Sequence, residues 1–379
     1  MFKKLDEYLD AFLVMGVPGY DTVIYKDGEC IYRRTKGYSD IARWIPMKGN
    51  ERYNIYSVSK PITAAAALQL YEKGAFKLTD KLSDYMPEFK NMAVKNSDGT
   101  LAPAKNPITV EHLFTMTAGF SYEVGTPELV RGYNETNGEC PTREMMKYLA
   151  REPLIFEPGT SWHYSYCTDV LAALVEVISG ERFSEYVRKN VFEPLGMHDS
   201  TFNLPEDGLD TLCMQYRFSG IPRKAKAIDK NIQFYKFGPM YESGGAGCIS
   251  TVDDMMRFLE ALRVGDVILK SETIDLMCRD HLNDLTREKY WYPNYGYGLG
   301  VRCPKTPYTT DFGWGGAAGA YVMIDRKNGI TACHAQHTIN SPNSAERRAL
   351  AGIITECIMG KSTEKADAKE NEHTLEKYQ

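Results

Sequence analysis

A serine and a lysine three residues apart, Ser57 and Lys60, are the pair in this sequence that most directly suggests covalent chemistry. They open an Ala-rich stretch, where residues i and i+3 share one face of a helix. A serine hydroxyl is a weak nucleophile and needs a nearby base. A partly buried lysine whose pKa is lowered by desolvation can accept that proton. A helix-capping serine followed by a solvated lysine has the same spacing, so the spacing alone does not decide between the two interpretations.

The same spacing recurs at Ser362 and Lys365, in a polar segment where nothing would exclude water, and we attribute that copy to chance. Other signatures are missing from the sequence, which has no Gly-x-Ser-x-Gly elbow, His-Glu-x-x-His motif, Walker loop or strand-linked Gly-x-Gly-x-x-Gly. His334 and His337 fall in an expected strand, where a spacing of three puts them on opposite faces. We therefore expect neither a metal ion nor a cofactor.

Ser57 is expected at the junction between a strand and a helix. The preceding segment, Tyr53–Tyr56, has the composition of a strand. Residues 61–73 are Ala-rich, with a proline in the first turn and a glycine just past the end, which predicts a helix. Ser57 then lies at the helix N-terminus, and Lys60 points along the same side.

Strands are expected at both ends of the chain, with helices between them. Residues 20–26 and 30–37 alternate apolar and polar residues around Asp27-Gly28, which is a strong hairpin signal. The later segments predicted as strands are 295–303, 309–312, 320–324 and 330–336. This distribution predicts an α/β (α+β) fold, in which one antiparallel sheet flanked by helices is built from both chain ends around an inserted, mostly helical region.

Several helices carry recognisable end signals. A buried helix is predicted over 169–179 with Asp169 as its cap, and another follows Thr251, which forms a capping signature with Asp254. A closing helix is predicted over 347–358. The first helix is amphipathic, with one apolar face formed by Leu5, Leu9, Phe12 and Leu13.

The composition is that of a globular protein with two or three structural units. The chain has 379 residues, of which 43% are hydrophobic and 25% charged. The net charge is −5 without a basic stripe, and no run of 18 apolar residues occurs, so we expect neither a nucleic-acid partner nor a membrane span. The predicted units are a sheet domain (1–75 and 245–360), a helical domain (76–244) and a polar tail (361–379).

The sequence also predicts a cytoplasmic location. Lys3 and Lys4 precede apolar residues, but acidic residues interrupt any signal-peptide core and no small-residue cleavage site follows. The nine cysteines have no C-x-x-C spacing, which indicates reduced and mostly buried thiols.

Segments along most of the chain resemble the serine β-lactamase-like family, which includes class C β-lactamases, D-alanyl-D-alanine peptidases and family VIII carboxylesterases. The segment from Tyr53 to Gly74 resembles the segment that contains the nucleophile in that family. The resemblance continues in order through four further segments and a nine-residue stretch that occupies the place of the third motif. These are EHLFTMTAGFSY (111–122), EPGTSWHYSYCTDVLAALVEVISG (157–180), VFEPLGMHDSTF (191–202), GGAGCISTVDDMMRF (244–258) and GWGGAAGAY (313–321).

The resemblance implies a β-lactamase/transpeptidase-like fold and specific roles. Ser57 would be the acylated nucleophile, Lys60 its proton acceptor and Tyr164 a proton shuttle. The Lys60 ammonium would favour the phenolate form of Tyr164, and which of the two is the formal base stays open. The backbone N–H groups of Ser57 and Ala317 would hold the oxyanion.

Departures from the β-lactamase pattern favour an esterase. The second motif has Tyr166 where that pattern has Asn, and the third has Trp314-Gly315-Gly316 where it has Lys-Thr-Gly. Loss of that cation weakens anion recognition, and an indole offers an apolar wall. These features resemble family VIII carboxylesterases, which tend to carry an acid at the position of Asp169. The further candidates for substrate binding are Tyr122, Tyr166, Asp169, Tyr295 and Tyr297.

We therefore expect a serine hydrolase that cleaves small carboxylic esters or amides through an acyl-Ser57 intermediate. An acyltransferase using the same acyl-enzyme, a β-lactamase or D-amino-acid peptidase, and a catalytically silent binding protein are the alternatives. Retention of Ser57, Lys60 and Tyr164 together argues against the last of them. The oligomeric state is beyond the sequence.

Overall fold

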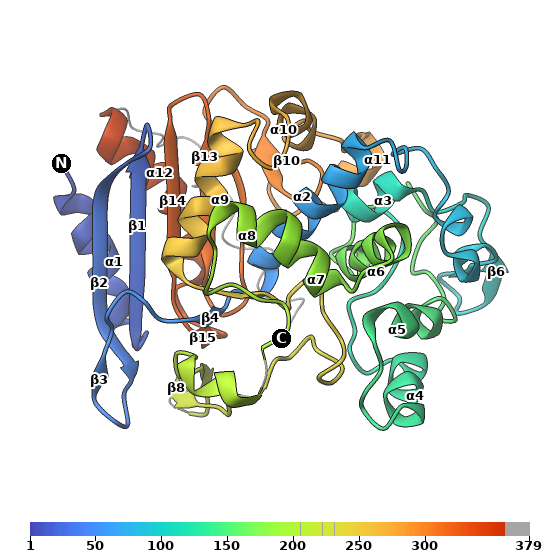
Figure 1. Cartoon of the computed structure of the whole chain (residues 1–379), viewed down its shortest axis with the longest axis horizontal. Coiled ribbons are helices and arrows are strands. Elements are labelled where there is room, and N and C mark those ends of the chain that lie inside the picture. The colour runs from blue at the N-terminus through green and yellow to red at the C-terminus, as the bar shows by residue number, and fades with distance from the viewer. Residues whose placement is uncertain (205, 222, 231, 361–379) are drawn as a thin grey trace.

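The computed structural model describes residues 1–360 except 205, 222 and 231. Its largest sheet has eight antiparallel strands and combines both ends of the chain (Figure 1). Six residues of β1 pair with β14, so an N-terminal strand and a C-terminal strand are direct neighbours. In spatial order the strands are β10 (Tyr295–Tyr297), β11 (Arg302–Pro304), β12 (Phe312–Gly315), β13 (Tyr321–Asp325), β14 (Ile330–Ala335), β1 (Gly19–Lys26), β2 (Glu29–Asp40) and β3 (Ile45–Pro46).

Helices cover both faces of this sheet. On one face α1 (Lys3–Val14) and α12 (Ser344–Met359) pack together and bury an apolar cluster against β1, β13 and β14. On the other face α9 (Val252–Val264) packs against β1, β13 and β14, and α2 (Ser59–Glu72) contacts β12. The predicted fold, with an antiparallel sheet flanked by helices and built from both chain ends, is confirmed.

The middle of the chain supplies most of the remaining helices and contributes strands to three small sheets. The helices are α3 (Val110–Thr115), α4 (Pro127–Glu135), α5 (Thr142–Leu149), α6 (Cys167–Ser179), α7 (Phe183–Val187) and α8 (Glu193–Leu195), with α10 (Ser271–Met277) and α11 (Asp284–Arg287) following α9. The small sheets pair β4 (Tyr53–Asn54) with β9 (Ile249–Ser250), β5 (Ala93–Lys95) with β6 (Leu101–Pro103), and β7 (Tyr216–Ser219) with β8 (Lys224–Ala227) and β15 (Thr338–Ile339).

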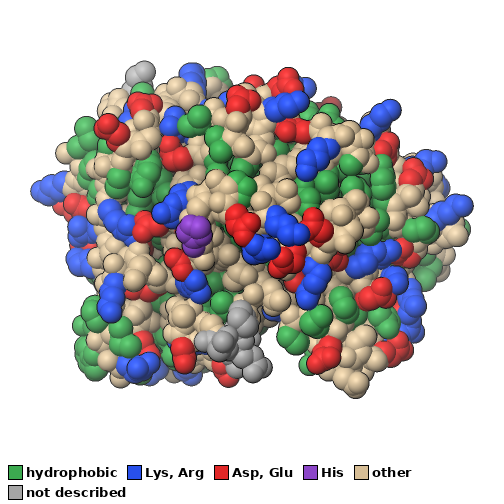
Figure 2. All heavy atoms as spheres, in the orientation of Figure 1, with side chains coloured by type: hydrophobic (Ala, Val, Ile, Leu, Met, Phe, Trp, Pro, Cys, Tyr) green, Lys and Arg blue, Asp and Glu red, His purple; other side chains and the backbone are tan. Residues whose placement is uncertain are grey.

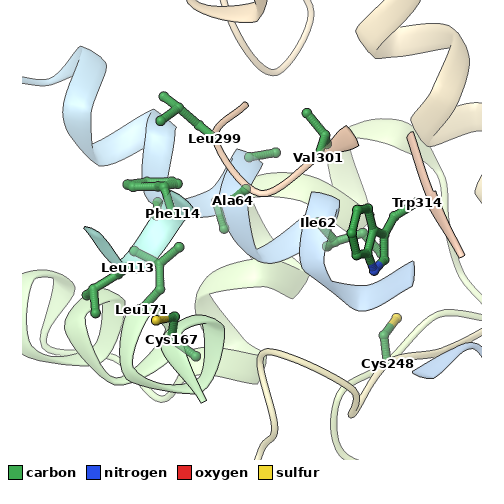
Figure 3. Packing of buried hydrophobic residues seen from close by; sticks show 14 of the residues in the cluster. Ile62, Ala64, Leu113, Phe114, Cys167, Leu171, Cys248, Leu299, Val301 and Trp314 are labelled. Atoms are coloured by element: carbon green, nitrogen blue, oxygen red, sulfur yellow. The ribbon is translucent and has the colours of Figure 1, made fainter. Parts of the chain in front are cut away.

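Helix α2 lies at the centre of the molecule, which explains how a lysine in its first turn is buried. Every residue from Ser59 to Leu70 is buried. Figure 3 shows Ile62 and Ala64 of α2 packed among buried apolar side chains from other segments, including Leu113 and Trp314. The small side chains of the alanine run keep α2 thin, so that α6 packs closely against it.

Most local predictions are confirmed. The hairpin turns at Asp27-Gly28, the closing helix spans the predicted residues, and the Thr251 hydroxyl caps α9 by accepting a hydrogen bond from the Asp254 amide. Leu5, Leu9 and Phe12 of α1 are buried, whereas Leu13 is only partly buried. The division into domains stays a prediction, and the tail 361–379, including Ser362 and Lys365, lies outside the described residues.

Two strand predictions near the C-terminus are wrong. The segment 295–303 is two strands, because the chain reverses between them and the Gly298 amide donates to the Val301 carbonyl at 2.8 Å. Gly300 in this reversal has a φ of +80°, a conformation that glycine adopts without steric cost. The strand predicted at 309–312 begins only at Phe312, since residues before it form a turn closed by the Thr309 hydroxyl.

Acidic and basic side chains are interspersed over the face drawn in Figure 2. Among the described helices, none is long and apolar enough to cross a membrane.

The described residues also contain no group of three or more His, Cys, Asp or Glu side chains positioned to hold a metal ion. Burial lowers the pKa of His334 to about 3 and that of His337 to about 4, so both imidazoles are neutral. All nine cysteines are free, and most are buried.

Candidate active site

Ser57 lies in a strained turn between β4 and α2. Residues Tyr56–Val58 form one turn of 3-10 helix, and Tyr56 has a φ of +47°, in the left-handed region. For a bulky residue this conformation costs on the order of 1–3 kcal/mol and persists only where the surroundings enforce it. Here the Tyr56 side chain is fully buried, and its hydroxyl donates to Gln215 Oε1 at 2.6 Å. The strained turn holds Ser57 just before the N-terminal end of α2, and 7% of the residue is exposed.

The Lys60 amine points at the Ser57 hydroxyl. Its Nζ donates to Ser57 Oγ at 3.3 Å and to the Gly245 carbonyl at 2.7 Å. Burial lowers the pKa of Lys60 from 10.5 to about 7, although the negative charge of Asp169 acts in the opposite direction. A large part of the Lys60 population is therefore a neutral amine near pH 7, and a neutral amine can accept a proton.

The glycine-rich turn before β9 is held against the first turns of α2. The Cys248 amide donates to Ser59 Oγ at 2.9 Å, and the Thr63 hydroxyl donates to the Gly244 carbonyl at 2.7 Å. A Cβ at Gly245 would lie 2.6 Å from Asp169 Oδ2 and 3.3 Å from Lys60 Nζ. Glycine is needed there because the turn passes between the carboxylate and the amine. The prediction that this cluster forms a tight turn is confirmed by the Gly247 amide, which donates to the Ser243 carbonyl.

Asp169 does not cap α6, contrary to the prediction. Tyr166 occupies the N-cap position and makes no side-chain capping bond, while Asp169 stands inside the first turn. Its Oδ1 accepts hydrogen bonds from the Ser243 hydroxyl at 2.6 Å and the Tyr241 hydroxyl at 2.9 Å. The carboxyl is fully buried, and burial raises its pKa while these bonds and the charge of Lys60 oppose the rise. Asp169 therefore ties α6 to the turn that contacts Lys60.

Tyr164 completes the group around Ser57. The Trp314 indole Nε1 donates to the Tyr164 hydroxyl at 3.3 Å, and the two rings stack with centroids 5.8 Å apart. The Lys60 amine lies 4.3 Å from the centroid of the Tyr164 ring. Burial raises the pKa of Tyr164 above its ordinary value of 10, and hydrogen bonds with Ser57 and Trp314 oppose this only in part. The expectation that Lys60 favours the phenolate is wrong, because both groups are desolvated and neither charged form is favoured.

The third-motif segment lies directly against the Ser57 turn. A Cβ at Gly316 would fall 2.3 Å from the Ile55 carbonyl oxygen, so only glycine fits this close approach. The Gly316 amide donates to the Ala320 carbonyl, which leaves Ala317 at the exposed tip of the turn. Trp314 itself is only 4% exposed. Its indole is therefore a buried hydrogen-bond donor to Tyr164 rather than the apolar wall that the sequence suggested.

Further aromatic rings enclose the site, and of these sequence reasoning missed Tyr235. Trp291 approaches Tyr164 with centroids 5.0 Å apart, and Tyr235 stacks on Tyr122 at 4.9 Å. Tyr122 is a predicted candidate, and its ring lies 5.3 Å from that of Tyr164. Trp291 belongs to the Tyr-rich run 290–297, whose composition fits the lining of an acyl pocket or a packed strand edge, whereas Tyr235 lies in a stretch without periodicity.

The other predicted substrate-binding tyrosines lie behind this layer. Tyr166 is 1% exposed and packs against Tyr122 and Phe237. Tyr297 is fully buried, with its ring 5.3 Å from that of Trp314. The Tyr295 hydroxyl donates to Asp311 at 2.8 Å, in a separate polar cluster. These three residues support the site from behind, and the structure brings none of them to Ser57.

Comparisons with known proteins give a family match, a related esterase and two solved structures of similar fold. Residues 5–351 match a family model described as Beta-lactamase. Esterase EstB from Burkholderia gladioli is 29% identical over 358 residues, covering 86% of this chain and 88% of that protein. EstCE1, described as a hydrolase with promiscuous acyltransferase activity, has a TM-score of 0.75 and 25% identity over 92% of this chain and 99% of its own. Simvastatin synthase LovD from Aspergillus terreus shares the fold, with a TM-score of 0.75 at 22% identity over 91% and 95% of the two chains.

Proposed function

Because this chain belongs to the beta-lactamase family, we propose that it is a serine hydrolase that cleaves small carboxylic esters through an acyl-Ser57 intermediate. The observation that carries the proposal is the 3.3 Å contact between Ser57 Oγ and a fully buried Lys60 amine. Esterase EstB, at 29% identity over most of both chains, supports an ester as the substrate.

In the proposed acylation step, the neutral Lys60 amine takes the proton of Ser57 as Oγ attacks the ester carbonyl. The amide groups of Ser57 and Ala317 stabilise the oxyanion. The tetrahedral intermediate then expels the alkoxide, which takes a proton from the Tyr164 hydroxyl, and Lys60 returns the proton to Tyr164. Tyr164 is protonated near neutral pH because burial raises its pKa, and an alkoxide is a strong enough base to take the proton of a phenol. Water, activated by the same groups, releases the acid and restores Ser57.

Two features favour an ester over a β-lactam or a D-amino-acid peptide. The segment 313–321 contains no Lys or Arg of its own, and the Arg347 guanidinium beside it donates to the Gly316 carbonyl at 3.3 Å. The side chains that surround Ser57 are mostly uncharged aromatic rings, and the Lys60 amine contacts two of them, Tyr122 and Tyr164. An aromatic enclosure gains binding free energy from apolar acyl or alcohol groups.

Transfer of the acyl group to an alcohol instead of water is the second candidate. It uses the same acyl-enzyme, and EstCE1 is described as having promiscuous acyltransferase activity. The two reactions differ only in which nucleophile reaches the acyl-Ser57 carbonyl.

The proposal predicts turnover of short-chain p-nitrophenyl esters, with little cleavage of a chromogenic cephalosporin. Hydrolysis alone yields the acid, whereas acyl transfer in the presence of added alcohols yields a new ester, and chromatography of the products separates the two. Efficient cephalosporin turnover with slow ester turnover would contradict the esterase assignment.

The pH dependence follows from Lys60. Since the neutral amine is the base and burial lowers its pKa to about 7, kcat/KM for a neutral ester should rise with pH through a midpoint near 7 and level off above it. Below the midpoint Lys60 is protonated and cannot accept the Ser57 proton. Initial rates from pH 5 to 9 measure this, with the Ser57→Ala protein as the blank for spontaneous hydrolysis. A rate that is constant across this range would exclude Lys60 as the base.

A further inference from the structure

Strands β7 and β8 carry a cationic face, and one strand, β15, separates it from the turn of the third-motif segment 313–321. Arg217 on β7 pairs with Ile339 of β15 on one side and with Lys226 of β8 on the other, so these three side chains share a face. The Thr338 amide of β15 donates to the Ala318 carbonyl at 2.8 Å, which attaches this small sheet to the turn that carries Ala317. Neighbouring strands lie about 4.8 Å apart, so Arg217 is within about 10 Å of that turn.

A chain of aromatic contacts links Arg217 to the active site. Its guanidinium carbon lies 4.3 Å from the centre of the Phe234 ring. Phe234 and Tyr235 pack on a cluster formed by Tyr56, Ala246, Ala318 and Ile339. Tyr235 in turn stacks on Tyr122 of the site. The positive charge of Arg217 also lowers the pKa of the Tyr56 and Tyr235 hydroxyls against the effect of burial, so Arg217 lies near both.

The charge of Arg217 is not neutralised within the described part of the chain. None of the ion pairs there includes Arg217 or Lys226. The Nε of Arg217 is buried without a hydrogen-bond partner, although a guanidinium normally uses its donors when they are removed from water. The sequence from Thr211 to Ile228 has four Lys or Arg residues and no acidic residue, with Asp210 and Asp229 bordering it. A buried, unpartnered guanidinium donor next to a second cation matches the recognition of a carboxylate or phosphate.

We propose that Arg217 and Lys226 form an anion-binding subsite, and that the preferred substrates are esters with a carboxylate or phosphate group remote from the bond that is cleaved. This inference rests on the proposed function. The segment 313–321 has no Lys or Arg of its own and the Arg347 guanidinium beside it is bonded to the Gly316 carbonyl, whereas Arg217 supplies a cation farther away. Phe234 and Tyr235 lie between Arg217 and Tyr122, so the substrate would bind along these rings with its charged end at β7.

Matched pairs of esters test the subsite and show which half of the substrate carries the anion. On the acyl side, mono-p-nitrophenyl glutarate is compared with p-nitrophenyl pentanoate, and on the alcohol side 4-acetoxybenzoate with 4-acetoxybenzamide. The wild-type protein should prefer the anionic member of one pair. Arg217→Gln should lower the ratio of the two kcat/KM values about 10- to 100-fold, as expected for losing a hydrogen bond to a charged group. Added salt should weaken the preference of the wild type.

Lys224 provides the matched control, because it lies on the same face of β8 two residues from Lys226 but pairs with Ser219 instead of Arg217. Lys224→Gln should leave the ratio unchanged. Equal kcat/KM values within both pairs, or an equal loss for both members in Arg217→Gln, would overturn the subsite while leaving the esterase proposal intact. If no ester is turned over, calorimetric binding of the glutarate and pentanoate esters to the Ser57→Ala protein, with and without Arg217→Gln, decides the subsite independently.

Discussion

Replacing Ser57 by alanine should lower ester turnover by about 10⁴- to 10⁶-fold, the range seen when a hydrolase loses its nucleophile. The substitution removes one hydroxyl from a residue that is 7% exposed, so the fold should be retained. The loss therefore comes from the chemistry, since the Lys60 amine remains but has no proton to accept. Steady-state rates with p-nitrophenyl acetate measure the effect, and circular dichroism measures the fold.

Intact-mass spectrometry after treatment with a fluorophosphonate supplies a second readout for Ser57. The wild-type protein should gain one adduct, and Ser57→Ala should gain none. Ser362→Ala is the matched control, because it removes the serine of the other Ser-x-x-Lys segment, and it should keep both the adduct and the full rate. Turnover by Ser57→Ala near the wild-type rate would show that another residue is the nucleophile.

Removing the Tyr164 hydroxyl should lower kcat by about 10²- to 10⁴-fold, the contribution of a general acid–base group. In Tyr164→Phe the ring stays stacked on Trp314, so the packing of the site is preserved. The alkoxide would then lose its proton donor. The effect should be smaller for p-nitrophenyl esters than for alkyl esters, because p-nitrophenolate leaves without a proton.

Tyr53→Phe is the matched control for this variant. The Tyr53 hydroxyl is buried and has no hydrogen-bond partner, so its removal should leave kcat unchanged. An equal fall in kcat for nitrophenyl and alkyl esters in Tyr164→Phe would mean that Tyr164 positions Ser57 rather than protonating the leaving group. A wild-type kcat for alkyl esters would remove Tyr164 from the mechanism.

Local signals predicted much of the fold and the pairing of Ser57 with Lys60. A hairpin turn, a helix start and a capping threonine each depend on a few neighbouring residues, and the i, i+3 spacing places Lys60 beside Ser57 once the helix exists. Where the local signal was ambiguous the prediction failed. The apolar segment 295–303 has the composition of one strand, and only the reversal at Gly298 divides it.

The lowered pKa of Lys60 was predicted, but the partners of Asp169 and the pKa of Tyr164 were not, because these depend on contacts between distant segments. The carboxyl group of Asp169 was expected at a helix end, yet it binds Tyr241 and Ser243, more than 70 residues away. The pKa of Tyr164 depends on how completely the surrounding rings exclude water, and sequence reasoning assigned it the wrong direction. Burial of this kind results from the packing of the whole domain.

The pairing of β1 with β14 has a consequence for how the protein folds. The hydrogen bond between Thr22 and His334 joins residues 312 positions apart, so this part of the sheet cannot form until the last strands have been synthesised. Contacts of such long range make folding slow. Until then the hairpin of β1 and β2 exposes an edge whose backbone groups can pair with another nascent chain. Aggregation during expression should therefore depend on how quickly β14 reaches β1, and truncation before Ile330 removes the partner strand altogether.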